Sequence, residues 1–323
     1  MDTMKLGATN LEVSRIAFGG MGIGSPSWRS WVRDEHQSRA IIERALELGM
    51  FTFDTCDYYS AGEGEKVLGA HLHELIGREE VVIATKFGNP VSPGPNGRGY
   101  SRKHVMAAVD DSLRRLGTDY IDLYQTHIWR EPVRVEEVIE ALHDLVVSGK
   151  VRYVGVADMP TWRVAEFVYK ARAMGLREIV SVQHHYNLVW RGNERELIPF
   201  CEHESLGMLS YSPLARGFLA HPSGHDRDTE RARTDELSRT SYGRQADHDV
   251  AAALQQVAGT RGISMAAVAL AWVLARNPRA TPLIGATTVT QLTAVEEALA
   301  CTLSPEELAQ LEQPYQPRMR YGH

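Results

Sequence analysis

Three consecutive segments decide the fold: VVIATKF at residues 81–87, SRKHVMAAVDDSLRRLG at 101–117 and YIDLYQTH at 120–127. The first and third are short and rich in β-branched and aromatic residues, which is typical of buried strands. The middle segment is longer and amphipathic, which indicates a helix packed on one face. A strand, a helix and a second strand in succession form the repeating unit of a parallel sheet.

The same alternation runs through the whole chain. Strands are predicted at residues 14–20, 51–56, 81–87, 120–127, 151–158, 179–188, 207–215 and 281–286. Helices are predicted at 35–49, 63–75, 101–117, 135–149, 161–175, 195–205, 249–260, 265–275 and 288–300. Strands this apolar belong to a parallel sheet buried on both faces, and eight units close such a sheet into a barrel. We therefore predict an α/β fold, a (β/α)8 TIM barrel, as one domain over residues 1–323.

Three further segments lie outside this repeat. Residues 5–14, KLGATNLEVS, predict an N-terminal β-hairpin that caps the bottom of the barrel. Residues 221–248, rich in Asp, Arg, Ser and Thr, predict a mobile loop after the seventh strand. In the last segment, LSPEELAQLEQ, Ser304 and Glu307 have the spacing of a capping box and predict a C-terminal helix.

Composition excludes several classes of protein. The 323 residues are 43% hydrophobic and carry a net charge of −6, so we expect no nucleic-acid partner and no anionic membrane surface. The longest apolar run, at 265–275, is far shorter than the roughly 20 residues that span a bilayer. Cys56, Cys201 and Cys301 are widely spaced and odd in number, which favours reduced thiols and a cytoplasmic location without a signal peptide. We interpret Cys56 as a small buried residue rather than a redox thiol.

Polar residues at the predicted strand ends carry the chemistry, because the active face of such a barrel lies at its carboxyl end. Asp54 ends the second strand, Lys86 the third and His127 the fourth, with Tyr59 just after Asp54. A buried lysine needs a counter-charge, and Asp54 and Lys86 alone would be typical of a structural ion pair. Tyr59 and His127 add an acid and a hydrogen-bonding group. An adjacent ammonium should lower the pKa of a phenol from about 10 and make it a better proton donor.

An ordered set of motifs spans the chain: DTCDYY with GEGEKVLG, ATKFG, YQTH, GVAD, QHHYN, YSPLARG and IGATTVTQL. This set resembles the signature of the aldo-keto reductases, closest to their bacterial and potassium-channel β-subunit-like branches. The resemblance implies an NADP(H)-dependent reductase of aldehydes or ketones, including keto sugars and natural-product intermediates. It implies Tyr59 as general acid, Lys86 as the group that lowers its pKa, Asp54 as the partner of Lys86, and His127 as the group that orients the carbonyl.

The resemblance also implies a cofactor surface. Asp158 and Gln183 would face the nicotinamide carboxamide, and Tyr211 would stack on the ring. The pyrophosphate would lie against Ser212, Leu214, Arg216 and Gly217, and the adenosine end against Gly285, Thr287, Thr288 and Gln291. The full predicted surface also includes Gly20, Met21, Asp54, Ala157 and Pro213.

Several positions depart from the family pattern. In GVAD, which replaces the usual G-x-S-N, Ala157 lacks a hydroxyl and Asp158 only accepts hydrogen bonds while it is ionised. Ala294 and Val295 stand where Glu and Asn often contact the adenine. Thr288 replaces an arginine often found near the 2′-phosphate, so we expect a weak preference for NADPH and some use of NAD(H).

Two other functions remain open at this point. A β-subunit-like protein could use its cofactor as a redox sensor on a partner, with slow turnover. A barrel enzyme could use Lys86 as a Schiff-base lysine with pyridoxal phosphate, although this leaves Tyr59, Gln183 and YSPLARG unexplained. GGMGIG at residues 19–24 lacks the dinucleotide-binding spacing, HESLG at 203–207 breaks the zinc motif, and we predict no metal site around His184 and His185.

Five aromatic residues of the predicted loops form a candidate substrate wall. They follow the first, second, fourth and sixth strands and are Trp28, Trp31, Tyr58, Trp129 and Trp190. Their rings would suit an apolar or sugar-stacking pocket for a small-molecule carbonyl substrate.

Overall fold

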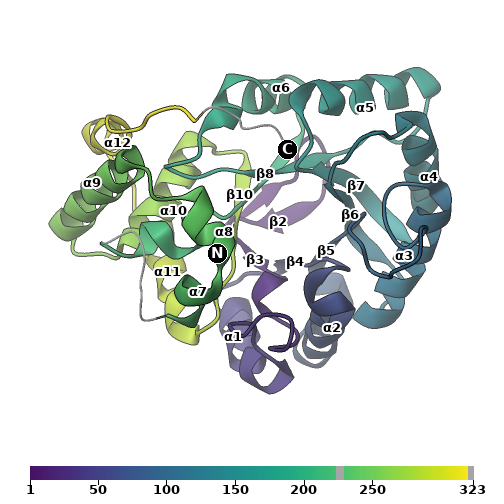
Figure 1. Cartoon of the computed structure of the whole chain (residues 1–323), viewed down its shortest axis with the longest axis horizontal. Coiled ribbons are helices and arrows are strands. Elements are labelled where there is room, and N and C mark those ends of the chain that lie inside the picture. Colours follow the sequence, from purple (N-terminus) through teal and green to yellow (C-terminus); the bar gives the residue numbers. More distant parts are fainter. Residues whose placement is uncertain (223–228, 319–323) are drawn as a thin grey trace.

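The computed structural model describes residues 1–222 and 229–318, and its centre is a closed barrel of eight parallel strands (Figure 1). The strands are β3 (Ala17–Gly19), β4 (Thr52–Asp54), β5 (Val82–Phe87), β6 (Ile121–Ile128), β7 (Val151–Ala157), β8 (Ser181–His185), β9 (Gly207–Tyr211) and β10 (Ala280–Ile284). They pair in chain order, and β10 closes the ring against β3. The predicted (β/α)8 barrel is confirmed.

Helices surround the barrel in the order of the chain, as the colour sequence in Figure 1 shows. They are α1 (Glu35–Glu47), α2 (Glu63–Leu75), α3 (Arg102–Leu116), α4 (Val135–Val147), α5 (Thr161–Met174), α6 (Leu197–His203), α9 (Gln245–Arg261), α10 (Met265–Arg276) and α11 (Thr293–Leu299). The helix predicted at 288–300 is divided, because Val289–Leu292 forms a separate 3-10 turn before α11.

An N-terminal hairpin, β1 (Thr3–Lys5) with β2 (Glu12–Ser14), lies across the barrel in Figure 1. Leu6 and Val13 are almost fully buried and share a hydrophobic cluster with inward-facing strand residues such as Leu123 and Leu209. The predicted cap is therefore confirmed. Because these apolar side chains fill the bottom of the barrel, the opposite end is the one left open to a ligand.

The segment predicted as a mobile loop contains two short helices. They are α7 (Glu230–Thr234) and α8 (Glu236–Ser241), and α9 already begins at Gln245. The part of the prediction that concerns residues 223–228 lies outside the described residues. At the other end of the chain, α12 (Pro305–Glu312) begins with the predicted capping box between Ser304 and Glu307.

No single helix within 1–222 and 229–318 is long and apolar enough to cross a bilayer. The pair α9 and α10 passes a test of length and composition only when both are taken together, and the two helices are bent by 103°.

Close packing of α2 against α3 depends on Gly69. A Cβ at this position would lie 2.3 Å from the carbonyl oxygen of Leu116, which is backbone and cannot rotate away. We expect Gly69→Ala to lower the free energy of unfolding by about 1–3 kcal/mol because of this overlap. Gly259→Ala in α9 is the matched control, since nothing lies within 4 Å of the point that its new methyl group would occupy, and it should raise stability by about 0.5–1 kcal/mol. Urea unfolding of both variants measures the difference, and equal stabilities would contradict this account of the helix contact.

Candidate active site

A cleft of about 2850 Å³ opens at the carboxyl end of the barrel strands. With the exception of Lys86, every residue predicted from the sequence to act at the site lines it. These residues are Gly20, Met21, Trp28, Trp31, Asp54, Tyr58, Tyr59, His127, Trp129, Ala157, Asp158, Gln183, Trp190, Tyr211, Ser212, Pro213, Leu214, Arg216, Gly217, Gly285, Thr287, Thr288 and Gln291. Lys86 is fully buried. Segments from both halves of the chain therefore meet around one cavity.

Lys86 and Asp54 form a buried ion pair, as predicted. Lys86 Nζ lies 2.5 Å from Asp54 Oδ1 and donates to the carbonyl oxygen of Thr55 at 2.8 Å. The other oxygen of Asp54 accepts from the side-chain amides of Gln125, at 3.1 Å, and Gln183, at 2.9 Å. Burial by itself lowers the pKa of Lys86, but the combined effects of Asp54, Tyr59 and Cys56 outweigh it and the net pKa is raised. The lysine therefore stays charged at neutral pH.

Tyr59 lies next to this pair. Lys86 Nζ is 5.5 Å from the centre of the Tyr59 ring, and the ring of His127 meets it edge-on with centroids 6.1 Å apart. Burial raises the pKa of Tyr59, and the opposing effect of Lys86 is smaller, so the net pKa lies above that of a free phenol. The prediction of a net lowered pKa is thus wrong for the chain itself, because the sequence did not reveal how strongly the phenol is desolvated. The charge of Lys86 does lower the pKa of Tyr59, as predicted, but by less than burial raises it.

The tautomer of His127 is set by Asn89, which the sequence did not single out. Asn89 Nδ2 lies 2.6 Å from His127 Nδ1, and the thiol of Cys56 lies 3.1 Å from the same nitrogen. An amide nitrogen only donates, so Nδ1 is the acceptor and the ring proton resides on Nε2. Burial, followed by Lys86 and Arg130, lowers the pKa of His127 to about 3. His127 is therefore a neutral hydrogen-bond donor at physiological pH.

The floor of the cleft near Asp54 presents groups that suit a carboxamide and a flat ring. The side-chain NH2 of Gln183 is occupied by Asp54, but its carbonyl oxygen accepts no hydrogen bond among the described residues and lines the cleft. Asp158 Oδ1 accepts from the Tyr211 hydroxyl at 2.8 Å, which holds the Tyr211 ring in place. Both acceptors suit a ligand that donates N–H groups.

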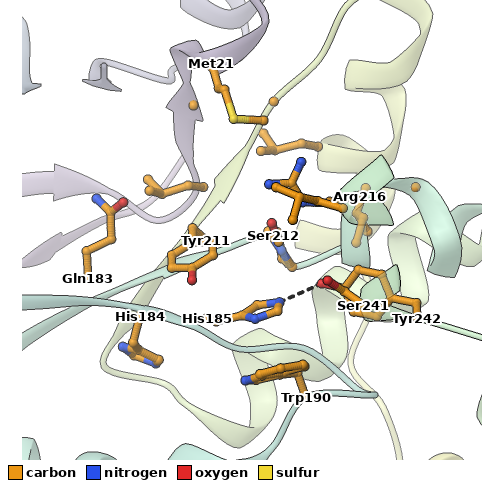
Figure 2. Close-up of a pocket in the computed structure, with 18 of the residues that line it drawn as sticks. Met21, Gln183, His184, His185, Trp190, Tyr211, Ser212, Arg216, Ser241 and Tyr242 are labelled. Carbon is orange, nitrogen blue, oxygen red and sulfur yellow. Dashed lines mark hydrogen bonds between the residues drawn. The ribbon is translucent and has the colours of Figure 1, made fainter. Parts of the chain in front are cut away.

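Tyr211 is backed by a column of rings, shown in Figure 2. It stacks on His185 with centroids 5.0 Å apart and an interplanar angle of 11°, and His185 stacks in turn on Trp190 at 4.4 Å. The Tyr242 hydroxyl, 2.6 Å from His185 Nε2, fixes the middle ring (Figure 2). Such a column leaves Tyr211 as a rigid stacking platform at the cleft.

A group of basic residues that the sequence only partly indicated lies beyond Tyr211. Arg216 and Arg231 both contact Asp235, at 2.7 Å and 3.4 Å, so two cations share one carboxylate. Burial and then Arg216 lower the pKa of Arg231 to about 10, and the residue keeps its charge at neutral pH. Its guanidinium also lies 4.3 Å from the centre of the Trp31 ring. The surplus positive charge suits a diphosphate, so these residues fit a dinucleotide.

The backbone is strained around the same cleft. Asp158, Ser212, Ala215 and Arg216 have φ values of 45°, 51°, 48° and 56°, although none of them is glycine. Left-handed φ angles at non-glycine residues cost free energy and persist where the surrounding structure enforces them, often at binding sites. The loops after β7 and β9 therefore have shapes dictated by the site.

The predicted substrate wall is divided in two. Trp28 lies beside Tyr58 and Tyr59, with ring centroids 5.9 Å and 6.1 Å away, so it faces the central groups of the cleft. Trp129 instead packs into the core, stacked on Tyr100 at 4.7 Å, with only 7% of its surface exposed. Trp28 and Tyr58 thus form the more accessible aromatic wall.

One expectation for the distal end of the cleft needs revision. Val295 is fully buried in the hydrophobic core and does not line the cleft, whereas Ala294 does. Thr288 is exposed and its hydroxyl lies 3.0 Å from that of Thr290. As for metals, the described ranges hold no group of three or more His, Cys, Asp or Glu side chains placed to bind an ion.

Comparisons with known proteins agree with this arrangement. A model of the aldo/keto reductase family matches residues 15–316. The versiconal hemiacetal acetate reductase of Aspergillus parasiticus is 38% identical, and the match covers 98% of each protein. The aldo-keto reductase AMT2 of Alternaria alternata is 37% identical over 99% of this chain and 93% of its own length. A candidate aryl-alcohol dehydrogenase of Saccharomyces cerevisiae, AAD16, is 35% identical over 98% of this chain and 97% of its own length.

Fold and comparisons together define the class, an oxidoreductase built on a (β/α)8 barrel. The chain belongs to the aldo/keto reductase family. Members of this family typically combine a nicotinamide cofactor with a small-molecule carbonyl substrate, and the groups around Gln183, Tyr211 and Arg216 fit such a cofactor.

The ion pair gives the first prediction for this site. Lys86→Met leaves Asp54 as a buried carboxylate without a cation, so we expect a loss of about 3–5 kcal/mol in the free energy of unfolding. Adding Asp54→Asn should recover part of that stability and none of the lost rate. Urea unfolding and steady-state kinetics measure the two effects. A Lys86→Met protein as stable as the wild type would show that the pair contributes nothing to folding.

A second buried carboxylate stands two residues before Tyr59 in the chain. Asp57 is 1% exposed, and its Oδ2 atom has no hydrogen-bond partner among the described residues. Burial and then Glu65 raise the pKa of Asp57 from 3.8 to about 7. Since the folded state holds this proton to higher pH than the unfolded state does, the contribution of Asp57 to stability falls as the pH rises from about 4 to about 7.

We therefore expect the stability of Asp57→Asn to increase relative to that of the wild type as the pH rises. Between pH 5 and pH 8 the difference in the free energy of unfolding should shift by about 2–3 kcal/mol in favour of the variant. Urea unfolding at intervals across this range provides the measurement. Asp110→Asn, at a half-exposed carboxylate paired with Lys150, is the control and should run parallel to the wild type. Parallel curves for Asp57→Asn as well would place its proton release outside this window.

Proposed function

We propose that this chain reduces the carbonyl group of a small molecule to an alcohol, with NADP(H) as its cofactor. The observation that carries the proposal is the buried Lys86–Asp54 pair at the carboxyl end of the barrel, with Tyr59 and His127 beside it. When bound, the reduced nicotinamide supplies the hydride. The four side chains account for the proton and for the position of the carbonyl oxygen.

His127 and Tyr59 divide the work at that oxygen. His127 is neutral and carries its proton on Nε2, so it can donate a hydrogen bond to the carbonyl and orient it. Tyr59 then gives its phenolic proton to the oxygen as negative charge develops there. The raised pKa of Tyr59 keeps the phenol protonated before the reaction, and the Lys86 ammonium stabilises the phenolate that remains.

Aromatic carbonyl compounds are the substrate class that we favour. Trp28 and Tyr58 offer flat apolar surfaces next to Tyr59, and Trp28 also lies under the guanidinium of Arg29 at 4.4 Å. Two of the relatives are named for a hemiacetal acetate and for aryl alcohols. A ring stacked on Trp28 would place an attached carbonyl within the reach of Tyr59 and His127.

Pyridoxal phosphate chemistry is disfavoured by the state of Lys86. A Schiff-base lysine needs a lowered pKa to act as a nucleophile, whereas the pKa of Lys86 is raised, because Asp54, Tyr59 and Cys56 together outweigh the effect of burial. A measurement of turnover distinguishes a slow redox sensor from an enzyme. A sensor would oxidise its bound NADPH once, whereas an enzyme would consume many equivalents of NADPH.

We further propose that the chain acts as one domain in the cytoplasm. Cys56, Cys201 and Cys301 are all free thiols, which suits a reducing compartment. Burial raises the pKa of both Cys56 and Cys201, so neither is activated for redox chemistry.

The proton donor can be tested directly. Tyr59→Phe should lower the rate of NADPH-dependent reduction of an aryl aldehyde by about 10²-fold or more, because the general acid is lost. Affinity for NADPH, measured by calorimetry, should stay nearly unchanged. Tyr169→Phe on α5 removes an exposed phenol far from the cleft and serves as the control. Full activity of Tyr59→Phe across a panel of carbonyl compounds would exclude this mechanism.

A further inference from the structure

Arg33 lies in the loop between β3 and α1, and the sequence analysis assigned no function to this residue. It is half-buried and lines the cleft. Backbone hydrogen bonds to Gly22, at 2.8 Å, and Gly24, at 2.9 Å, fix its position. Its side chain reaches across to the segment after β10, where Nε donates to the carbonyl oxygen of Thr287 at 3.0 Å. The loop after β3 thereby brings a cation to the distal end of the cleft.

This guanidinium has no compensating anion among the described residues. Within residues 1–222 and 229–318, no carboxylate oxygen lies within 4.0 Å of the Arg33 guanidinium. Among those residues, Nε is the only nitrogen of the guanidinium with a hydrogen-bond partner. The adjacent carboxylate, Asp34, is occupied as the N-cap of α1. By contrast, Arg44 on α1 pairs with Glu47 and Glu296 at the surface. A half-buried arginine with free donors in a cleft favours an anionic ligand.

The surroundings of Arg33 narrow the choice of anion. Thr287, which it contacts, is followed by the exposed Thr288, and the hydroxyl of Thr288 lies 3.0 Å from that of Thr290. A cation with a planar fork of donors that contacts the segment carrying these two hydroxyls suits a phosphate monoester, which accepts several hydrogen bonds at once. Arg216 and Arg231 also line the cleft, but they share the carboxylate of Asp235 and so differ from Arg33 in having an anionic partner.

We infer that Arg33 binds the 2′-phosphate of NADP(H) and makes this chain selective for NADPH over NADH. The inference rests on the proposed function, because it takes the segment from Thr287 to Gln291 as the adenosine end of the cofactor site. It reverses the weak preference expected from Thr288 alone. The arginine missing from the strand-end segment is replaced in space by one from a loop more than 250 positions earlier in the chain.

Binding measurements on the intact chain test this residue without relying on turnover. Calorimetric titration with NADPH and with NADH gives both dissociation constants for the wild type and for Arg33→Gln. Loss of a charge-assisted contact to the phosphate should weaken NADPH binding by about ten- to a hundredfold and leave NADH binding unchanged. Arg44→Gln, which removes the same charge from the outer face of α1, should bind both cofactors like the wild type.

Fragments of the cofactor sharpen the test. Adenosine 2′,5′-bisphosphate carries the 2′-phosphate and adenosine 5′-monophosphate does not, so only the first should lose affinity in Arg33→Gln. Equal losses for NADPH and NADH would overturn the inference and assign Arg33 to holding the two loops together. Unchanged affinities for both would overturn it as well. A wild-type chain that binds neither cofactor would instead overturn the proposed function.

Discussion

The buried contact between Lys86 and Asp54 constrains everything around it. A carboxylate inside a barrel is stable only if its charge and its lone pairs are satisfied, and here they are satisfied by a lysine and two glutamine amides. Asp54, Lys86, Gln125 and Gln183 belong to four strands, β4, β5, β6 and β8. The same hydrogen bonds that neutralise the charge therefore tie opposite walls of the barrel together and orient Gln183 toward the cleft.

The properties of the neighbouring groups follow from this contact. Because Lys86 remains charged, it disfavours a second cation nearby and helps to keep His127 neutral. Lys86 also stabilises a phenolate at Tyr59, and Arg216 adds a smaller effect in the same direction. The loops around these groups are held in strained conformations at Asp158, Ser212 and Arg216, so the rigid strands supply the charges and the loops supply the shape.

The sequence predicted the barrel, its hairpin cap and the Lys86–Asp54 pair because these depend on short-range patterns. Alternating strands and helices define the number of units, and residues at strand ends must meet at one face of a closed sheet. Asn89, Arg231 and Arg33 were missed because their roles depend on how loops fold back, which no spacing along the chain reveals. The net pKa of Tyr59 was predicted in the wrong direction for a related reason, since its sign depends on the extent of burial.

Arg33 lies in a loop, whereas the Lys86–Asp54 ion pair lies on barrel strands, and this difference affects how the protein can evolve. Lys86 and Asp54 are strand residues whose replacement disturbs the interior of the barrel. Arg33 belongs to a loop, and within residues 1–222 and 229–318 its side chain hydrogen-bonds only to the backbone of Thr287. A lineage can thus exchange residue 33 by a single codon change while the reacting groups remain intact. Descendants adapted to cells richer in NADPH or in NADH would then share the same reacting groups and differ in the loop between β3 and α1.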